Sequence, residues 1–298
     1  DIDFVEVSDN DLDNDMYESA EKQYLQNNRS KAISAFRKYI ERFPNGAHVL
    51  NANFFLAESY YAEKQQSASV KHYQYVINQE RNEFTEKALT KMAQLYLEEE
   101  NWKLAMPVLE RLEEQADFSQ NITFAQSNLM KGHYELEHYE DAVTYAEKVL
   151  QRSKLENRVK SDAIVIIARS AYKTGDEGKA EEAYKEVEKI AKGELKAEAL
   201  YFDAYFKHRD GNYKVSNSVV QKLVADYSAY KYFGSKGLIV MAKNFYELED
   251  AYQATYILEN VIKNFSDFKD VVDEAKVELQ KIKTEEAKTN ESVNPDQN

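Results

Sequence analysis

Apolar side chains recur along this chain every three or four residues, which is the spacing of one face of an α-helix. Ala142, Ala146 and Val149 form one such stripe, and Leu129 belongs to another stripe that ends just before it. Only about four residues, 135–138, separate the two stripes. Two helices joined by so short a turn must lie antiparallel, so this stretch predicts a helical hairpin.

The same hairpin pattern repeats along the chain. A small residue near the start of the second helix recurs at steps of 36 to 38 residues, at Ala32, Ala68, Ala105, Ala142, Ala180, Ser216 and Ala254. An aromatic residue precedes it by eight to ten positions, at Tyr24, Tyr60, Tyr96, Tyr134, Tyr172, Phe206 and Tyr246. Small residues are needed where two helix backbones approach closely. The repeat therefore predicts an all-α solenoid of about seven antiparallel helix pairs.

The two ends of the chain depart from the repeat. Residues 267–283 read as one more helix whose outer face is charged, which is what a solenoid needs to cap its last apolar surface. Residues 1–14 are rich in aspartate and are predicted to be an acidic linker. Residues 284–298 contain few apolar side chains and are predicted to be a disordered tail. The predicted solenoid with its capping helix spans residues 15–283.

The repeat pattern resembles the tetratricopeptide repeat (TPR) family. The first repeat carries an alanine, an aromatic and a terminal proline in the family's order, at Ala32, Phe36 and Pro44. The stretch 39–46 is similar to bacterial envelope members of that family, of the outer-membrane assembly lipoprotein and tol–pal-associated types. The resemblance implies a right-handed solenoid that binds a protein or peptide in its concave groove.

Composition and charge narrow the function classes. Only 8 Gly and 3 Pro occur in 298 residues, which favours long helices. The net charge of −14 disfavours binding to nucleic acid or to an anionic membrane surface. The absence of cysteine excludes disulfides, thiol catalysis and cysteine-ligated zinc. No apolar run approaches the length that spans a bilayer, so no membrane insertion is expected.

The sequence offers no convincing metal, cofactor or catalytic motif. The aspartates at 9–15 alternate as in calcium loops, but the twelfth position holds Ala20 or Lys22 instead of glutamate. His133 and His138 are five residues apart, so they are not expected to share a helical face as zinc ligands would. No phosphate loop or nucleophile motif is present. We therefore predict no metal, no cofactor and no enzyme activity.

By analogy with the TPR family, the first helix of each pair lines the groove. The positions eleven residues before the small column are then Glu21, Ala57, Gln94, Lys131, Arg169 and Lys243, and the sixth repeat, whose spacing is shifted, offers Asp203. The aromatic column lies one turn further along, and Tyr17 and Asn53 lie one turn earlier. The predicted partner-binding residues are Tyr17, Tyr24, Asn53, Tyr60, Gln94, Lys131, Tyr134, Arg169, Tyr172, Lys243 and Tyr246. For the tyrosine rings, packing between neighbouring repeats is the alternative.

Lys131 and Arg169 suggest the chemistry of a ligand. They stand 38 residues apart, and Tyr134 and Tyr172 repeat the same offset. This arrangement predicts a groove that accepts an acidic or C-terminal segment. The alternative is that both cations pair with nearby glutamates and bind nothing.

The leading functional hypothesis is a protein–protein interaction scaffold, located in the bacterial periplasm or at the outer membrane, with the cytoplasm as the alternative location. A second hypothesis is a structural spacer module of a larger envelope protein. A third is a helical enzyme that handles glycans or lipids, which would need an enclosed pocket with converging carboxylates. The partner and the oligomeric state stay open at this level.

Overall fold

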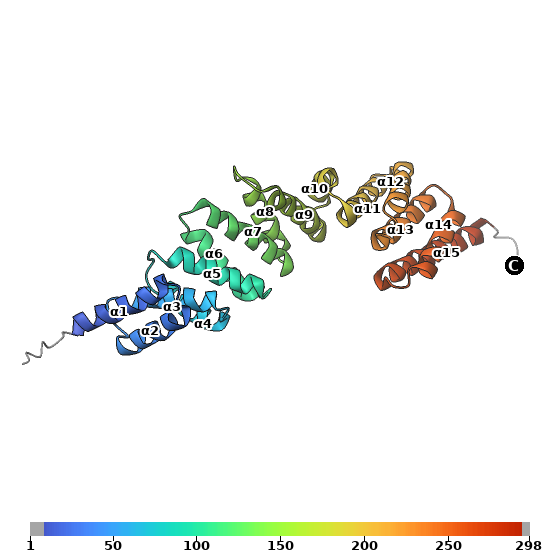
Figure 1. Cartoon of the computed structure of the whole chain (residues 1–298). Coiled ribbons are helices and arrows are strands. Elements are labelled where there is room, and N and C mark those ends of the chain that lie inside the picture. The colour runs from blue at the N-terminus through green and yellow to red at the C-terminus, as the bar shows by residue number, and fades with distance from the viewer. Residues whose placement is uncertain (1–8, 294–298) are drawn as a thin grey trace, which may run out of the picture. The chain divides into compact units, whose positions relative to one another are not determined.

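The computed structural model describes the backbone of residues 9–293 and the side chains of residues 11–288. All fifteen secondary-structure elements in that part of the chain are α-helices, as the sequence predicted. They fall into two compact units, residues 1–138 and 139–298. Figure 1 labels the helices in chain order.

The first unit contains seven helices: α1 (Asp9–Leu25), α2 (Arg29–Arg42), α3 (Val49–Ala62), α4 (Gln66–Ile77), α5 (Thr85–Glu98), α6 (Trp102–Gln115) and α7 (Ser119–Glu135). The second unit contains eight: α8 (Tyr139–Leu150), α9 (Asn157–Thr174), α10 (Glu177–Ile190), α11 (Gly193–Arg209), α12 (Tyr213–Asp226), α13 (Lys231–Glu247), α14 (Ala251–Asn264) and α15 (Lys269–Val293). Within each unit every helix packs against the next one along the chain. The count agrees with seven helix pairs and one capping helix.

Seven turns that link a first helix to a second helix share one backbone conformation. Each has one residue in the left-handed region, namely Asn27, Lys64, Glu100, Glu137, Gly175, Gly211 or Glu249. In each turn the amide that follows this residue donates to a carbonyl five residues earlier, as in Asn101 N–H to the Tyr96 oxygen at 2.8 Å. Since glycine occupies only two of these positions, the turn cannot be recognised from glycine alone.

In each pair the left-handed turn residue lies five positions before the small residue of the second helix. This constant spacing shows that one member of the predicted column, Ala68, was misplaced by one residue. In the second pair the matching residue is Ser69, which is fully buried, whereas Ala68 is only half-buried. The Ser69 hydroxyl donates to the Ala57 carbonyl at 3.0 Å, and Ser216 does the same to Ala204 at 2.7 Å. A small hydroxyl can therefore replace alanine because it bonds directly to the backbone of the facing helix.

The first helices carry a matching column that the sequence analysis missed. Twelve residues before each small residue lie Ala20, Ala57, Ala93, Met130, Ala168, Ala204 and Ala242, and all seven are fully buried. Six of the seven are alanine, so both helices of a pair present a short side chain where they meet. This permits the close approach of the backbones, and larger side chains such as Phe36 and Leu223 fill the space on either side.

Both ends of the helical array differ from the prediction. α1 begins at Asp9, inside the segment predicted to be a linker, and Asp13 is buried. α15 continues to Val293, ten residues into the predicted disordered tail, because Glu, Lys and Ala favour a helix. The Tyr246 hydroxyl also donates to Glu285 Oε2 at 3.0 Å. The rest of both predicted end segments, residues 1–8 and 294–298, lies outside the described residues.

The capping role of α15 agrees with the prediction for residues 267–283. α15 packs against α13 and α14 and buries Val271, Ala275 and Ile282 in the core of the second unit. Across the described helices, none combines the length and the apolar character needed to cross a membrane.

Candidate functional site

The predicted partner-binding residues of the first two helix pairs lie mostly in the core of the first unit. Tyr17 is buried, its ring stacks on His48 at 4.4 Å, and its hydroxyl donates to Glu21 Oε1 at 2.8 Å. Tyr24 is half-buried with its ring 4.8 Å from that of Phe55 on α3. These two tyrosines join neighbouring helices, which is the packing role that was the alternative for their rings.

The second pair shows the same outcome. Tyr60 is buried and stacks on His72 with ring centroids 5.7 Å apart. Asn53 is also buried, and both ends of its amide are bonded inside the protein: Nδ2 donates to the Val49 carbonyl, and Oδ1 contacts His72 Nδ1, each at 2.8 Å. Both polar ends of the Asn53 amide are thus already bonded within the protein, and its contact with a partner stays a prediction.

The next three predicted residues are half-buried. Gln94 lies on α5, and Lys131 and Tyr134 lie on α7, one turn apart on the same helix. Their partial exposure leaves the prediction that they contact a partner as it stood.

Arg169 in the second unit is engaged in an internal ion pair. Its Nε and Nη2 atoms donate to Oε1 and Oε2 of Glu198 at 2.8 and 2.6 Å, a bidentate arrangement. The Tyr184 hydroxyl donates to the same Glu198 Oε1 at 2.9 Å. Glu198 is only 5% exposed. For Arg169 the alternative of pairing with a glutamate is the one that the structure contains, because the nearby buried carboxylate needs a cation.

The remaining predicted residues of the second unit are also bonded within it. Lys243 Nζ lies 3.3 Å from Glu274 and 3.5 Å from Glu278 on α15. The half-buried Tyr172 packs edge-on against Phe202, with ring centroids 4.7 Å apart. As described above, Tyr246 bonds to α15 through Glu285. These side chains therefore hold successive first helices together.

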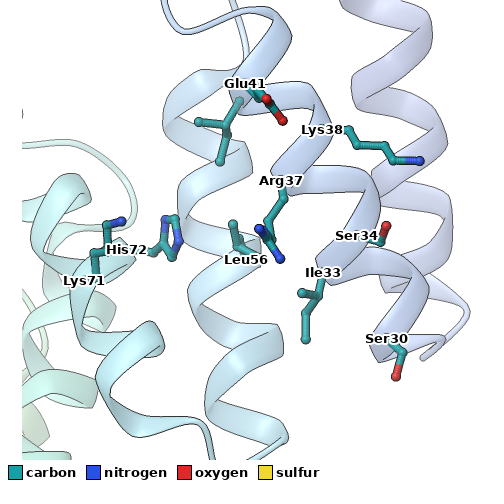
Figure 2. Close-up of a pocket in the computed structure, with 10 residues that line it drawn as sticks. Ser30, Ile33, Ser34, Arg37, Lys38, Glu41, Leu56, Lys71 and His72 are labelled. Carbon is teal, nitrogen blue, oxygen red and sulfur yellow. The ribbon is translucent and has the colours of Figure 1, made fainter.

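A second surface of the first unit, a groove, was not predicted. It runs over α3 between α2 and α4 and encloses about 690 Å³. Its lining residues are Ser30, Ile33, Ser34, Arg37, Lys38, Ile40, Glu41, Leu56, Lys71 and His72. Figure 2 shows Arg37 extending from α2 toward Leu56 of α3, with His72 facing the same space from α4. We call this feature the α2–α4 groove.

The α2–α4 groove is positively charged, unlike the chain as a whole. Together α2 and α4 carry six Lys and Arg residues and one Glu, a net charge of +5, in a chain of net charge −14. Arg37, Lys38 and Lys71 are exposed, and none of them forms an ion pair with a described residue. The charge of each helix, summed along the sequence, already distinguishes this surface, whereas the TPR analogy points only to the first helices.

His72 forms one wall of the groove, and its hydrogen bonds define its tautomer. Because Asn53 Nδ2 donates to the Val49 carbonyl, Asn53 Oδ1 must accept a hydrogen bond from the protonated Nδ1 of His72. Burial, and then the neighbouring Lys71 and Arg37 cations, lower the pKa of His72 from 6.5 to about 4. His72 is therefore neutral near pH 7, and its Nε2 atom is an acceptor.

This arrangement predicts the effect of the two cations on His72. Replacing Arg37 and Lys71 together with Gln should raise the pKa of His72 above 4 but leave it below 6.5, because burial persists. NMR titration of the His72 ring signals would measure it. The control is Lys22→Gln with Lys103→Gln, which removes two exposed cations outside the groove. An unchanged pKa in the groove variant would show that the cations do not act on His72.

His133 and His138 do not share a helical face, yet their side chains lie close together. Their ring centroids are 5.8 Å apart. The reason is that α7 ends at Glu135 and the turn brings His138 back, with its amide donating to the His133 carbonyl at 2.8 Å. Within the first unit the turn thus places two imidazoles side by side.

Comparison with known proteins supports the repeat assignment. A family model of the tetratricopeptide repeat matches residues 16–46, which cover most of α1, all of α2 and the turn after it. A comparison with curated proteins found no match. The matched segment contains the alanine, aromatic and proline positions noted in the sequence.

Solved structures with similar folds include proteins described as containing tetratricopeptide repeats. The C-terminal part of a TPR repeat-containing protein from Cytophaga hutchinsonii is 15% identical over 87% of this chain and 98% of its own, with a TM-score of 0.52. A tetratricopeptide repeat protein from Parabacteroides merdae is 11% identical over 89% of this chain and 98% of its own, with a TM-score of 0.43. The structure of Naa15/Naa10 bound to HypK-THB is 12% identical over 89% of this chain and 39% of its own, with a TM-score of 0.50.

At these identities the likeness shows the fold alone. The matched repeat and the similar folds support an assignment to the TPR family, and neither of them distinguishes the envelope type. A shared fold does not assign a function, so the function has to be argued from the surface of this chain.

Proposed function

We propose that this chain is a protein–protein interaction scaffold and that the α2–α4 groove of its first unit is a docking surface for a partner. The observation that carries the proposal is the combination of exposed, unpaired cations with a partly apolar floor in one concave surface. By contrast, Arg169 and Lys243, which were predicted to bind a partner, are bonded internally.

Several further observations agree with a binding role. The similar structure of Naa15/Naa10 bound to HypK-THB is a complex of proteins. The groove is open and lined with cations, with Glu41 as the one acidic residue in its lining. A helical glycan- or lipid-handling enzyme would instead need converging carboxylates in an enclosed pocket. The location in a bacterial envelope remains a prediction from the stretch 39–46.

Selection of peptides from a random display library on the immobilised full chain would test the proposal. We expect the chain to enrich a related set of peptides that compete with one another for binding. In a parallel selection, Arg37→Glu with Lys71→Glu should enrich a different set or none, while Lys22→Glu with Lys103→Glu should retain the original set. If the full chain enriches no peptide above an unrelated helical protein, the scaffold proposal is wrong.

A further inference from the structure

We infer that the α2–α4 groove binds a short acidic segment of a partner protein, one in which carboxylates alternate with apolar side chains. The inference rests on the proposed function and names the chemistry of the partner. It also differs from the sequence hypothesis, which placed an acidic ligand beside Lys131 and Arg169 on the first helices. The groove is formed mainly by the second helices α2 and α4, with Leu56 of α3 at its floor.

The cations of the groove are available to a ligand in this structure. Arg37 and Lys38 on α2 and Lys71 on α4 are exposed and make no ion pair with described residues. Glu41 also lines the groove, but it lies beyond ion-pair distance of Arg37, one turn before it on the same helix. An arginine with an unoccupied guanidinium can bind a carboxylate through two parallel hydrogen bonds, and lysines add less directional attraction.

The floor and rim of the groove indicate that the ligand is a polypeptide with apolar side chains. Ile33 and Ile40 on α2 are half-buried, and Leu56 beneath them is fully buried. Because the two isoleucines lie two helical turns apart, apolar side chains spaced along the ligand can cover them. On the rim, the hydroxyls of Ser30 and Ser34 and the acceptor Nε2 of His72 can bond a peptide backbone, which offers both donors and acceptors.

The surroundings of the groove disfavour a long polyanion such as nucleic acid. The adjacent helix α1 carries six acidic residues and one lysine, a net charge of −5. α1 packs against α2, so the basic surface is bordered by acidic residues on that side. A polyanion that extended beyond the groove would meet repulsion, whereas a short acidic peptide would not. Charge complementarity with a ligand of limited length therefore selects a peptide.

Defined peptides test this inference directly. The probe is a fluorescent synthetic peptide of glutamates interrupted by leucines, and the matched peptide has glutamine in place of each glutamate. We expect the full chain to bind the acidic probe at least about 10-fold more tightly than the glutamine peptide. Raising the salt concentration should weaken binding of the acidic probe much more than binding of the glutamine peptide, because only the acidic probe relies on ionic contacts.

Charge-reversal variants locate the binding surface. The double variant Arg37→Glu with Lys71→Glu should bind the acidic probe about 10- to 100-fold more weakly than the parent, because two charge-assisted contacts become repulsive. Lys22→Glu with Lys103→Glu changes the net charge by the same amount on exposed positions outside the groove and should stay within about 2-fold of the parent. Circular dichroism establishes that both variants are folded. If the groove variant does not fold, Arg37→Gln with Lys71→Gln replaces it.

The possible results separate the inference from the proposed function. Equal weakening in both charge-reversed variants would mean unspecific attraction and would overturn the inference. If the full chain does not bind the acidic probe but still binds displayed peptides, the assignment of an acidic ligand is overturned and the scaffold proposal stands. The inference would also be overturned if phosphatidylserine vesicles or single-stranded DNA bound the groove more tightly than the acidic probe does. If no peptide of any kind binds, the proposed function itself fails.

Discussion

Replacing Asp13 with alanine should lower the free energy of unfolding of the first unit by about 3 kcal/mol. Asp13 is buried and its carboxylate accepts two hydrogen bonds: the Tyr39 hydroxyl donates to Oδ1 at 2.5 Å, and the Ala47 amide donates to Oδ2 at 2.9 Å. Tyr39 in turn accepts a bond from the His48 amide at 3.0 Å. A single carboxylate thus ties α1 to α2 and to the turn before α3, and hydrogen bonds to charged groups contribute about 1.5–3 kcal/mol each.

The space around Asp13 leaves little room for the protein to adjust. A Cβ atom at Gly46 would lie 2.7 Å from the Tyr39 hydroxyl and 2.8 Å from Asp13 Oδ2, so the turn packs directly on this pair. Removing the carboxylate leaves the buried Tyr39 hydroxyl and the part-buried Ala47 amide without their acceptor.

Hydrogen exchange of the α1 to α3 amides would measure this effect, because it reports the opening of one unit separately from the other. Asp15→Ala is the matched control, since Asp15 is exposed on the same helix and should change stability by less than about 0.5 kcal/mol. Tyr39→Phe should give an intermediate loss, because the Ala47 bond to Asp13 persists. If these amides are as well protected from exchange in the Asp13→Ala variant as in the Asp15→Ala variant, the buried network does not stabilise the first unit.

The helical repeat was predictable because close packing of two helices restricts the residue type at a fixed position. The column from Ala32 to Ala254 follows from that restriction, and it was wrong by one residue only at Ala68. There the contact is made by Ser69, whose hydroxyl bonds the backbone of the facing helix. Size alone cannot distinguish two adjacent small residues. The left-handed turn residue five positions earlier does, but at Lys64 nothing in the side chain reveals the backbone angle.

The site was less predictable because the use of a polar side chain depends on its neighbours in three dimensions. Arg169 and Asn53 occupy positions that the family analogy assigned to the groove, yet Glu198 and His72 take up their polar atoms. Neither partner is implied by the spacing of the repeat. For the same reason the aspartates at 9–15 read as a solvated linker, although Asp13 turns inward from a helix. The basic character of α2 and α4 depends only on composition and could have been recognised by counting charges.

Replacing Glu198 with alanine should destabilise the second unit by about 3–4 kcal/mol. Its carboxylate accepts from Arg169 at both oxygens and from Tyr184 at one of them, so alanine removes three hydrogen bonds at once. Breaking a buried ion pair from one side costs more than the pair contributes, because the remaining charge loses its counterion. The Arg169 side chain is 38% exposed, so water can solvate part of its charge once Glu198 is removed. The expected loss of stability is therefore at the lower end of the range for a broken buried ion pair.

Three further variants identify the physical origin of the effect. Glu198→Gln keeps the shape and one of the two acceptor oxygens, so it should cost about half as much as alanine if charge and hydrogen bonding both contribute. Tyr184→Phe removes one neutral donor and should cost about 1 kcal/mol. Glu182→Ala, at an exposed position on α10, is the control and should be close to neutral. Hydrogen exchange across α9 to α11 gives the measurement. If the amides of α9 to α11 exchange at the same rates in the Glu198→Ala and Glu182→Ala variants, the ion pair between Arg169 and Glu198 does not form in solution. The prediction that Arg169 contacts a partner would then regain support.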